Sequence, residues 1–469
     1  TWTMKSIQSG VLLGTAKRLQ LQRGSDALQL LGIAIVLLPV LALLADGGAA
    51  RLGSLEQWMA LLNRASALVG TSLLLVHLIL VARVPWIESV FGLDKLTGAH
   101  KRLGQPLMYV LLLHTVTSVM QSAQQNVIDL WSSLVDLVVH YPEMLLALAG
   151  FLLMIVVTLS SISAARQRIS YEFWYLIHLL SYVAVFLAIP HQFAFGSTFL
   201  SQPWLSTYFA ALYVFTLVNV VWFRSLRPVV LSLTRGFSVG SVESSGNNSV
   251  SITIAGTDKG KIKFQSGQFF MVRVMTLEDF WRPHPFSASN SAGEGRLRFT
   301  IGSRGDFTER IQKVKPGTKI VLEGPYGVFT EAKRSMPKVT LMAAGIGVAP
   351  IRSLARQLAA KPGDLTILYR ANTENEAALA DELFEISKQR GHAIHLLIGQ
   401  RDKDVPWLPK QSKSSKPKAD YLLLAELAPD ILESDIYICG PEPWTKSLLK
   451  TLSKLSVPKS QIHVEEFAW

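Results

Sequence analysis

The stretch "YLIHLLSYVAVFLAIPHQFAFG" (175–196) is apolar along nearly its whole length, yet it contains two histidines, His178 and His191. An apolar run of about 20 residues is long enough to cross the hydrocarbon core of a bilayer as a helix. Ionisable side chains are costly inside a membrane, and where they occur they commonly serve function. The stretch therefore predicts a transmembrane helix, and it raises the question of what the two imidazoles bind.

Five more apolar runs accompany it in the first half of the chain. Mean hydropathy is +0.30 and only 17% of the 469 residues are charged, which is little charge for a protein surrounded by water. We therefore expect a six-helix transmembrane bundle over residues 27–226, after a cytoplasmic N-terminal segment of residues 1–26. The runs span 27–45, 58–82, 104–124, 144–163, 173–195 and 204–223.

Positive charge is distributed unevenly over the loops between these runs. Lysine and arginine are frequent before the first run, in loop 83–103 and from Arg224 onward, whereas loop 121–143 contains neither. By the positive-inside rule, the N-terminus and everything after the sixth run are expected to be cytoplasmic, with the bundle in the plasma membrane. Much of the formal charge of +12 follows from this placement, so the charge requires no nucleic-acid partner.

Four histidines recur at matched depths in the third and fifth runs. His100 and His114 are 14 residues apart, and His178 and His191 are 13 residues apart. At 1.5 Å per residue, each pair is separated by about 20 Å along its helix. Because both helices run from inside to outside, they predict an inner layer of His100 and His178 and an outer layer of His114 and His191. Pro190 is expected to re-aim His191 toward its partner.

Paired imidazoles from two helices are suited to axial ligation of haem iron, so the two layers predict two bis-histidine haems. The alternative is that each imidazole is only packed and hydrogen-bonded within the bundle. A fifth histidine, His77, lies near the cytoplasmic end of the second run. It is expected to contact the inner haem or to be structural.

Residues 227–336 read as short strands separated by turns, which predicts a small antiparallel β-barrel. Within it, "WRPHPFSAS" (281–289) offers an aromatic ring, Phe286, and a hydroxyl, Ser287. Further on, "GSRGDFTERI" (302–311) is a glycine-bearing turn that leads into a short helix, with Asp306 or Thr308 expected as its cap.

The start of that short helix is a candidate for receiving a pyrophosphate on its backbone N–H groups. A tight turn, "EGPYGVF" (323–329), follows. Any one of these segments alone is a weak signal, because a glycine-rich turn is usually only a turn. Their order along the chain is more informative.

From residue 337 the pattern changes to strand, loop and helix, which predicts a doubly wound α/β domain over 337–469. "VTLMAAGIGVAPIRSLARQL" (339–358) combines a strand, a loop with Gly345, Gly347 and Pro350, and an amphipathic helix. Such a loop cradles a phosphate at a helix N-terminus.

A second strand, "LTILYRA" (365–371), contains Arg370, and "GQRD" contains Arg401. An arginine near this strand end suits the 2′-phosphate of NADP, whereas an acidic residue there would suit NAD. The alternative is that both are solvated surface arginines.

Near the C-terminus, "IYICGPEPW" (436–444) is a further strand and a glycine–proline turn. It contains Cys439, the only cysteine, so no intramolecular disulfide forms. Cys439 is either inert packing or a neighbour of the reacting nicotinamide. Trp469 ends the sequence; it is either a frayed end or an indole that stacks on a flavin.

With these motifs in order, the second half resembles the ferredoxin–NADP reductase superfamily. Together with the six-helix, four-histidine half, the chain resembles the NADPH oxidase and ferric reductase family in a compact prokaryotic form. The segments that carry the resemblance are "HPFS", "GDFT", "GPYG", "AGIGVAP", "CGP" and the histidine spacings. The resemblance implies FAD on the barrel, NADPH on the α/β domain and two b-type haems in the membrane.

The same resemblance implies roles for individual residues, motif by motif. His284, Pro285, Phe286 and Ser287 line the flavin, with Ser287 near its reactive nitrogen. Gly305, Asp306, Phe307 and Thr308 match the segment at the FAD diphosphate. The nucleotide loop is matched by Gly345, Gly347 and Pro350, and the nicotinamide-side turn by Cys439, Gly440 and Pro441. Trp469 matches the terminal aromatic that covers the flavin and yields to nicotinamide.

One position departs from the animal oxidases. Where phagocyte-type enzymes have a second histidine one turn after the outer ligand, this chain has Ser118. Superoxide production from dioxygen is expected, but ferric-chelate reduction, favoured by Asp129 and Asp136 in an outer loop, stays open. A third reading is an electron-conduit subunit that feeds a separate protein, although no obligate protein partner is evident.

Overall fold

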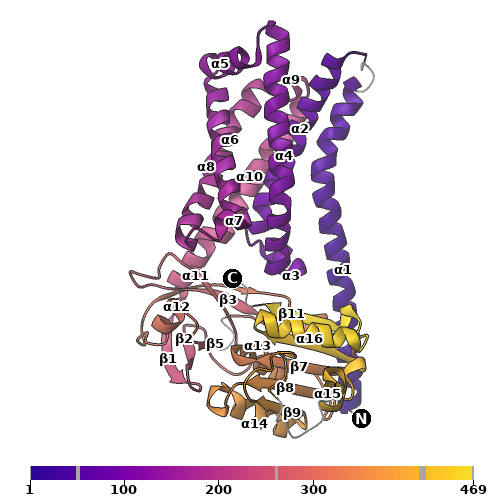
Figure 1. Cartoon of the computed structure of the whole chain (residues 1–469), viewed down its shortest axis with the longest axis vertical. Coiled ribbons are helices and arrows are strands. Elements are labelled where there is room, and N and C mark those ends of the chain that lie inside the picture. Colours follow the sequence, from indigo (N-terminus) through magenta and orange to yellow (C-terminus); the bar gives the residue numbers. More distant parts are fainter. Residues whose placement is uncertain (1, 49–52, 259–261, 411–418, 467–469) are drawn as a thin grey trace. The chain divides into compact units, whose positions relative to one another are not determined.

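The protein forms two compact units. The helical unit contains residues Ser25–Ile87 and Leu93–Arg224, and the C-terminal unit contains Thr1–Gly24, Glu88–Gly92 and Ser225–Trp469. The structure is a computed structural model (Figure 1). It describes residues 2–48, 53–258, 262–410 and 419–466.

Among the described residues, six helices are long and apolar enough to cross a membrane, which confirms the six expected spans. Their apolar stretches fix the helices, while polar flanks extend several of them beyond the length a bilayer requires. The segments are Leu19–Asp46, Leu55–Val81, Leu93–Asn126, Pro142–Ser161, Tyr171–Phe195 and Pro203–Arg235. They correspond to α1 (Trp2–Leu43) with a π-turn, α2 (Leu55–Val81), α4 (Leu93–Asn126), α6 (Pro142–Ser161), α8 (Tyr171–Phe195), and α10 (Pro203–Asn219) with a π-helical turn (Val220–Leu226) and α11 (Arg227–Arg235).

Within the helical unit, α2 packs on α4 and α6 packs on α8. Figure 1 shows these helices running alongside one another. Short helices connect the long ones, namely α3 (Pro85–Phe91), α5 (Leu130–His140), α7 (Ser163–Arg166) and α9 (Ser197–Ser201). α8 continues as an α-helix through Pro190. The histidine-bearing helices α4 and α8 are therefore each packed against the long helix that precedes them in the sequence.

The first part of the C-terminal unit is a six-stranded antiparallel barrel. Two three-stranded sheets, β1-β2-β5 and β4-β3-β6, are joined by the bridges Ser238↔Lys319 and Ala288↔Phe299. The interior is apolar, with Phe270 and Phe299 both 1% exposed. The elements are β1 (Ser238–Ser244), β2 (Ser249–Ala255), β3 (Phe269–Val274), β4 (His284–Ser287), β5 (Arg298–Gly302), α12 (Asp306–Ile311) and β6 (Ile320–Tyr326).

The second part is a five-stranded parallel sheet in the order β11-β10-β7-β8-β9. One face is covered by α13 (Val348–Gln357) and α14 (Ala380–Arg390), and the other by α15 (Asp420–Leu427) and α16 (Glu442–Lys454). This confirms the doubly wound α/β fold. The strands are β7 (Lys338–Ala344), β8 (Leu365–Ala371), β9 (Ala393–Ile398), β10 (Ser434–Gly440) and β11 (Ile462–Glu466).

The strand order reverses at β7, which lies between β10 and β8. In open α/β sheets, a crevice for ligands forms at such a reversal, outside the carboxyl ends of the strands. β7 ends at Ala344, directly before Gly345, and β10 ends with Cys439 and Gly440. The two glycine motifs found in the sequence therefore meet at the place where this fold binds nucleotides.

Candidate functional site: two histidine layers and a flavin–nucleotide crevice

The four intramembrane histidines form two pairs, as their spacing in the sequence predicts. The ring centroids of His100 and His178 are 6.0 Å apart, and those of His114 and His191 are 6.4 Å apart. A metal bound between two imidazoles at about 2 Å from each nitrogen would place the centroids about 6 Å apart. The separation within each pair thus fits bis-histidine ligation of an iron.

Backbone carbonyls orient one ring in each layer. His100 Nδ1 lies 3.2 Å from the carbonyl oxygen of His77, and His114 Nδ1 lies 3.4 Å from that of Asn63. A hydrogen bond donated from Nδ1 leaves Nε2 free to ligate, which is how metal-binding histidines are commonly held. On the opposite helix of the inner layer, His178 Nδ1 lies 3.5 Å from Ser161 Oγ. The protein therefore already supplies a hydrogen-bond partner for Nδ1 of these three imidazoles.

A cavity of about 160 Å³ adjoins the outer pair and is lined mostly by apolar side chains. His114, His191 and Ser118 reach its wall. Asn63 Nδ2 donates to Ser118 Oγ at 2.9 Å, so α2 and α4 share a hydrogen bond beside the outer layer. In the inner layer, His77 stacks on His100 at 3.7 Å, and thus it lies against the ring face of that histidine.

On the barrel, β4 carries the residues expected at the flavin. Ser287 Oγ and His284 Nε2 are buried and have no hydrogen-bond partner among the described residues. A buried polar atom without a partner is costly, so a bound group that satisfies both atoms is favoured. This donor and acceptor chemistry fits FAD.

Aromatic rings surround His284. Phe307 stacks on it with ring centroids 3.5 Å apart, and Phe286 lies 6.2 Å from Phe307. Burial lowers the pKa of His284 to about 4, and the nearby Arg282 guanidinium acts in the same direction. The imidazole is therefore neutral at pH 7. Pro285, between the two ring-bearing residues, pairs with Met271 of β3.

The cap expected for the short helix after Gly302 was wrong. Gly305 is the N-cap of α12, with no side-chain cap, and Asp306 is the first helical residue. Thr308 Oγ1 instead accepts from Arg304 N and donates to Gly305 O, both at 2.8 Å. Thr308 is the third residue of the helix, and its hydroxyl closes the turn at residues 304–305 in place of a side chain at the N-cap.

The nucleotide crevice brings three separate loops together. A Cβ on Gly347 would overlap the carbonyl oxygen of Cys439, so only glycine allows the loop after β7 to approach the end of β10. A Cβ on Gly302 would lie 3.5 Å from Ile346. One on Gly345 would lie 3.6 Å from Arg304 Nη2. The end of β5 in the barrel therefore meets the nucleotide loop directly.

The remaining residues expected here sit at the same edge of the sheet. Pro350 is in the first turn of α13, and Pro441 is the N-cap of α16 after Gly440. Cys439 is wholly buried, and burial raises the pKa of its thiol well above the ordinary value. It is thus a neutral thiol packed beneath the crevice. Trp469 lies outside the described residues.

Arg370 is the penultimate residue of β8, and Arg401 follows the end of β9 and lies near enough to act on its charge. Arg370 donates to Gly399 O at 2.9 Å and to Asn372 Oδ1 at 3.0 Å. Burial lowers the pKa of Arg370, and the positive charge of Arg401 lowers it further. Two like charges at one edge favour an anion, although Arg370 is already engaged in holding the loop.

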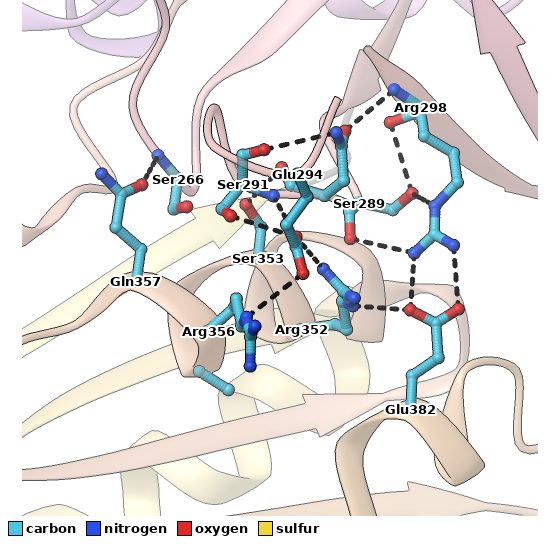
Figure 2. Close-up of polar contacts among 12 residues, drawn as sticks. Ser266, Ser289, Ser291, Glu294, Arg298, Arg352, Ser353, Arg356, Gln357 and Glu382 are labelled. Atoms are coloured by element: carbon cyan, nitrogen blue, oxygen red, sulfur yellow. Dashed lines mark hydrogen bonds and ion pairs between the residues drawn. The ribbon is translucent and has the colours of Figure 1, made fainter. Parts of the chain in front are cut away.

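A second set of polar residues was missed by the sequence analysis. Charged side chains from the barrel and from α13 and α14 interlock, as Figure 2 shows for Glu294, Arg298, Arg352 and Glu382. These residues are scattered over the sequence in ordinary polar contexts. Only the folded chain brings them together.

Comparison with known proteins agrees with this arrangement. Residues 66–189 match the ferric reductase like transmembrane component, 234–330 an FAD-binding domain, and 341–449 an oxidoreductase NAD-binding domain. The fold and these matches define a class, the multi-pass membrane oxidoreductases that depend on NAD(P)H and FAD. Within that class, the chain fuses a ferric-reductase-like transmembrane domain to FAD-binding and NAD-binding oxidoreductase domains, which is the domain organisation of the NADPH oxidase and ferric reductase family that the motifs predicted.

Individual relatives match about half of the chain. A flavohemoprotein of Vibrio cholerae is 26% identical over 228 residues, which cover 46% of this chain and 55% of the relative. The reductase component of propane 2-monooxygenase from Rhodococcus jostii is 24% identical, with coverages of 49% and 62%. The chain thus spans between half and two thirds of the length of these relatives.

Two solved structures are similar to the same extent. The flavohem-like FAD/NAD-binding domain of nitric oxide dioxygenase from Vibrio cholerae has a TM-score of 0.39 at 22% identity, covering 49% of this chain and 96% of that one. Ferredoxin-NADP+ reductase from Plasmodium falciparum has a TM-score of 0.41 at 17% identity, covering 49% and 94%.

Proposed function

We propose that the protein transfers electrons from cytoplasmic NADPH, by way of FAD and two b-type haems, to an acceptor on the outer side of the plasma membrane. Dioxygen, reduced to superoxide, is the acceptor we favour. The observation that carries the proposal is the presence of two histidine pairs, with centroid separations of 6.0 and 6.4 Å, on the same two helices.

The residues that would hold the haems are His100 and His178 in the inner layer and His114 and His191 in the outer layer. Haem iron, when bound, takes and gives one electron at a time. The chain itself fixes the imidazoles through the carbonyls of His77 and Asn63 and surrounds the outer pair with apolar side chains. An apolar, rigid environment keeps water away from a redox centre and limits reorganisation.

At the other end of the electron path, the chain binds and aligns the hydride donor and acceptor. FAD, when bound, accepts a hydride from NADPH and releases its electrons singly. Ser287 would offer a hydroxyl to the flavin, and the loop through Gly345 and Gly347 would receive the nucleotide phosphates. Arg401, with Arg370, would favour the 2′-phosphate. Trp469 would cover the flavin until nicotinamide displaces it.

Ferric-chelate reduction is the second candidate, and one structural detail weakens its sequence-based support. Asp129 caps α5 by accepting from Trp131 N and Ser132 N at 3.0 Å. Asp136 lies 2.8 Å from His140. Asp129 and Asp136 thus both have local partners, which reduces the attraction they offer to a cation. A conduit subunit for a separate protein is the third reading.

The test is reconstitution of the purified protein, with haem and FAD, in liposomes. NADPH added outside should be consumed, and dioxygen should yield superoxide, measured as cytochrome c reduction that superoxide dismutase suppresses. A ferrous chelator used under argon tests the second candidate. Oxidation of NADPH that produces neither signal without a partner protein would favour the conduit reading, and fewer than two haems per chain would contradict the proposal.

A further inference from the structure

One face of α13 is attached to the barrel along two helical turns. Ser353 Oγ donates to Asn290 O at 2.8 Å, and Gln357 Oε1 accepts from Ser266 N at 3.1 Å. Because residues four apart in a helix lie on one face, these contacts and those of Arg352 and Arg356 follow a single stripe. Figure 2 shows this stripe facing the barrel loop that contains Glu294.

The centre of the contact is a group of four charges, called the ring, in which Glu294, Arg352, Glu382 and Arg298 are linked in that order. Arg352 pairs with Glu294 of the barrel through Nη1, and its Nε lies 2.8 Å from Glu382 Oε2. That Nε has no aligned hydrogen bond, so the second contact is one of charge. Glu382 in turn accepts two hydrogen bonds from Arg298 of β5, both at 2.9 Å. Each domain thus supplies two members of the ring.

Both carboxylates are held in their charged form. Burial alone would raise the pKa of Glu294 and Glu382, but hydrogen bonds from the arginines outweigh it, and both pKa values lie below the ordinary value. Paired charges of this kind add little net stability and instead specify one relative arrangement of the parts that carry them. The forked geometry of arginine strengthens that specificity.

The ring lies close in sequence to both reacting sites. On the barrel side, Ser287 is followed two residues later by Ser289, whose carbonyl oxygen accepts from Arg298 Nη2 at 3.3 Å. On the nucleotide side, α13 begins directly after Gly347, and Arg352 is in its second turn. The flavin-facing strand β4 and the helix that follows the phosphate loop are therefore joined through the same four charges.

We infer that the ring of Glu294, Arg298, Arg352 and Glu382 positions the nucleotide loop against the flavin strand for hydride transfer. This inference rests on the proposed function, because it requires NADPH and FAD at those two places. The hydride leaves nicotinamide with its electron pair, and NADP+ and reduced flavin remain. The four side chains touch neither reactant. They act as positioning residues.

The test is the rate of flavin reduction in the full-length protein loaded with FAD. Glu382→Gln keeps the size of the side chain and removes its charge. Stopped-flow absorbance at saturating NADPH should show flavin reduction slowed about tenfold, since displacement by 1 Å costs up to about a hundredfold. FAD content and the dissociation constant for NADP+ should stay at wild-type values. Glu382→Asp should restore part of the rate.

The matched control is Asp420→Asn, which removes a carboxylate of the same domain whose partner, Lys454, lies 2.8 Å away on α16. It should reduce flavin at the wild-type rate. An unchanged rate in Glu382→Gln, or an equal loss in Asp420→Asn, would overturn the inference. If Glu382→Gln loses FAD, Glu294→Gln decides by the same criteria. Failure of wild-type flavin to react with NADPH would refute the proposed function separately.

Discussion

The helical unit and the C-terminal unit assemble their sites in different ways. In the helical unit, four histidines from two helices form two layers. The distance between the layers follows directly from the number of residues between the two histidines of each helix. In the C-terminal unit, the loops near residues 344–347 and 439–441 converge because the sheet order reverses at β7, and residues near 302–304 approach them from the barrel. Distances along a helix can be calculated from sequence spacing, whereas the position of a crevice between strands depends on the order of the strands in the sheet.

The two units also differ in how they hold polar groups. The intramembrane imidazoles of His100 and His114 rely on single backbone carbonyls in apolar surroundings. The C-terminal unit uses interlocked ion pairs such as that of Arg298 and Glu382. Removal of one histidine should thus abolish haem binding in its layer of the helical unit, whereas removal of one charged group in the C-terminal unit should only lower the rate of flavin reduction.

The largest expected effect is in the outer histidine layer. His114→Ala should lose the outer haem and stop electron transfer across the membrane, because the remaining imidazole of His191 has no counterpart. NADPH should still reduce FAD at the wild-type rate. The pyridine haemochrome assay should count one haem per chain, and a count of two in this variant would refute the assignment. His140→Ala, outside both layers, is the control.

The next largest effect is expected at the contact between two loops of the crevice. Gly347→Ala would force a Cβ into the carbonyl of Cys439, and overpacking of this kind costs about 1–3 kcal/mol. The reduction of FAD by NADPH should fall by about ten- to a hundredfold, with both haems retained. Gly293→Ala, where a Cβ would meet no atom within 4 Å, should be harmless. Equal behaviour of the two variants would exclude a close approach at Gly347.

The histidine layers and the glycine loops could both be predicted from the sequence. The six spans and the histidine pairing follow from periodicity and spacing, and the glycine loops follow from their position after predicted strands. The ring around Arg352 does not, since its members come from the barrel, α13 and α14 and no local pattern connects them. The cap predicted at Asp306 or Thr308 was wrong for a different reason, because local backbone geometry decides which residue takes the cap position, and here it is Gly305.

A smaller effect is expected at the edge of the nucleotide sheet. Arg401→Ala should raise the KM for NADPH about tenfold and leave that for NADH nearly unchanged, since a charge-assisted contact contributes about 1.5–3 kcal/mol. Arg370→Ala is a less direct test, because Arg370 also holds Gly399 O. Steady-state kinetics with both nucleotides give the answer. Equal use of NADH by the wild type would show that no 2′-phosphate site exists.

Deletion of Trp469 should change the KM for NADPH less than Arg401→Ala does, and it should lower this KM where Arg401→Ala raises it. An indole over the flavin competes with nicotinamide, so its loss should lower the KM for both nucleotides and reduce the preference for NADPH. It should also increase direct reduction of soluble dyes. Unchanged kinetics and unchanged dye reduction would indicate that this residue has no role at the flavin.

The smallest effect is expected from acidification of the barrel. His284 stays neutral in the fold, with a pKa of about 4, whereas in the unfolded chain it takes up a proton near its ordinary value of 6.5. Stability should thus fall as pH drops from 6.5 toward 4, because over that range the unfolded chain binds a proton that the folded imidazole does not. His284→Phe should flatten the pH dependence of the thermal midpoint, followed by flavin fluorescence. Parallel curves for variant and wild type would contradict this assignment.

The burial of Cys439 has a practical consequence for measuring motion between the units. It is the only thiol in the sequence and is fully buried in the core between the sheet and α13, so maleimide reagents will not reach it in the folded protein. A cysteine introduced on any exposed helix would therefore be the only position labelled. Pairs of spin labels or fluorophores can be attached without first removing a native thiol, and the crevice itself stays unmodified while distances are recorded during turnover.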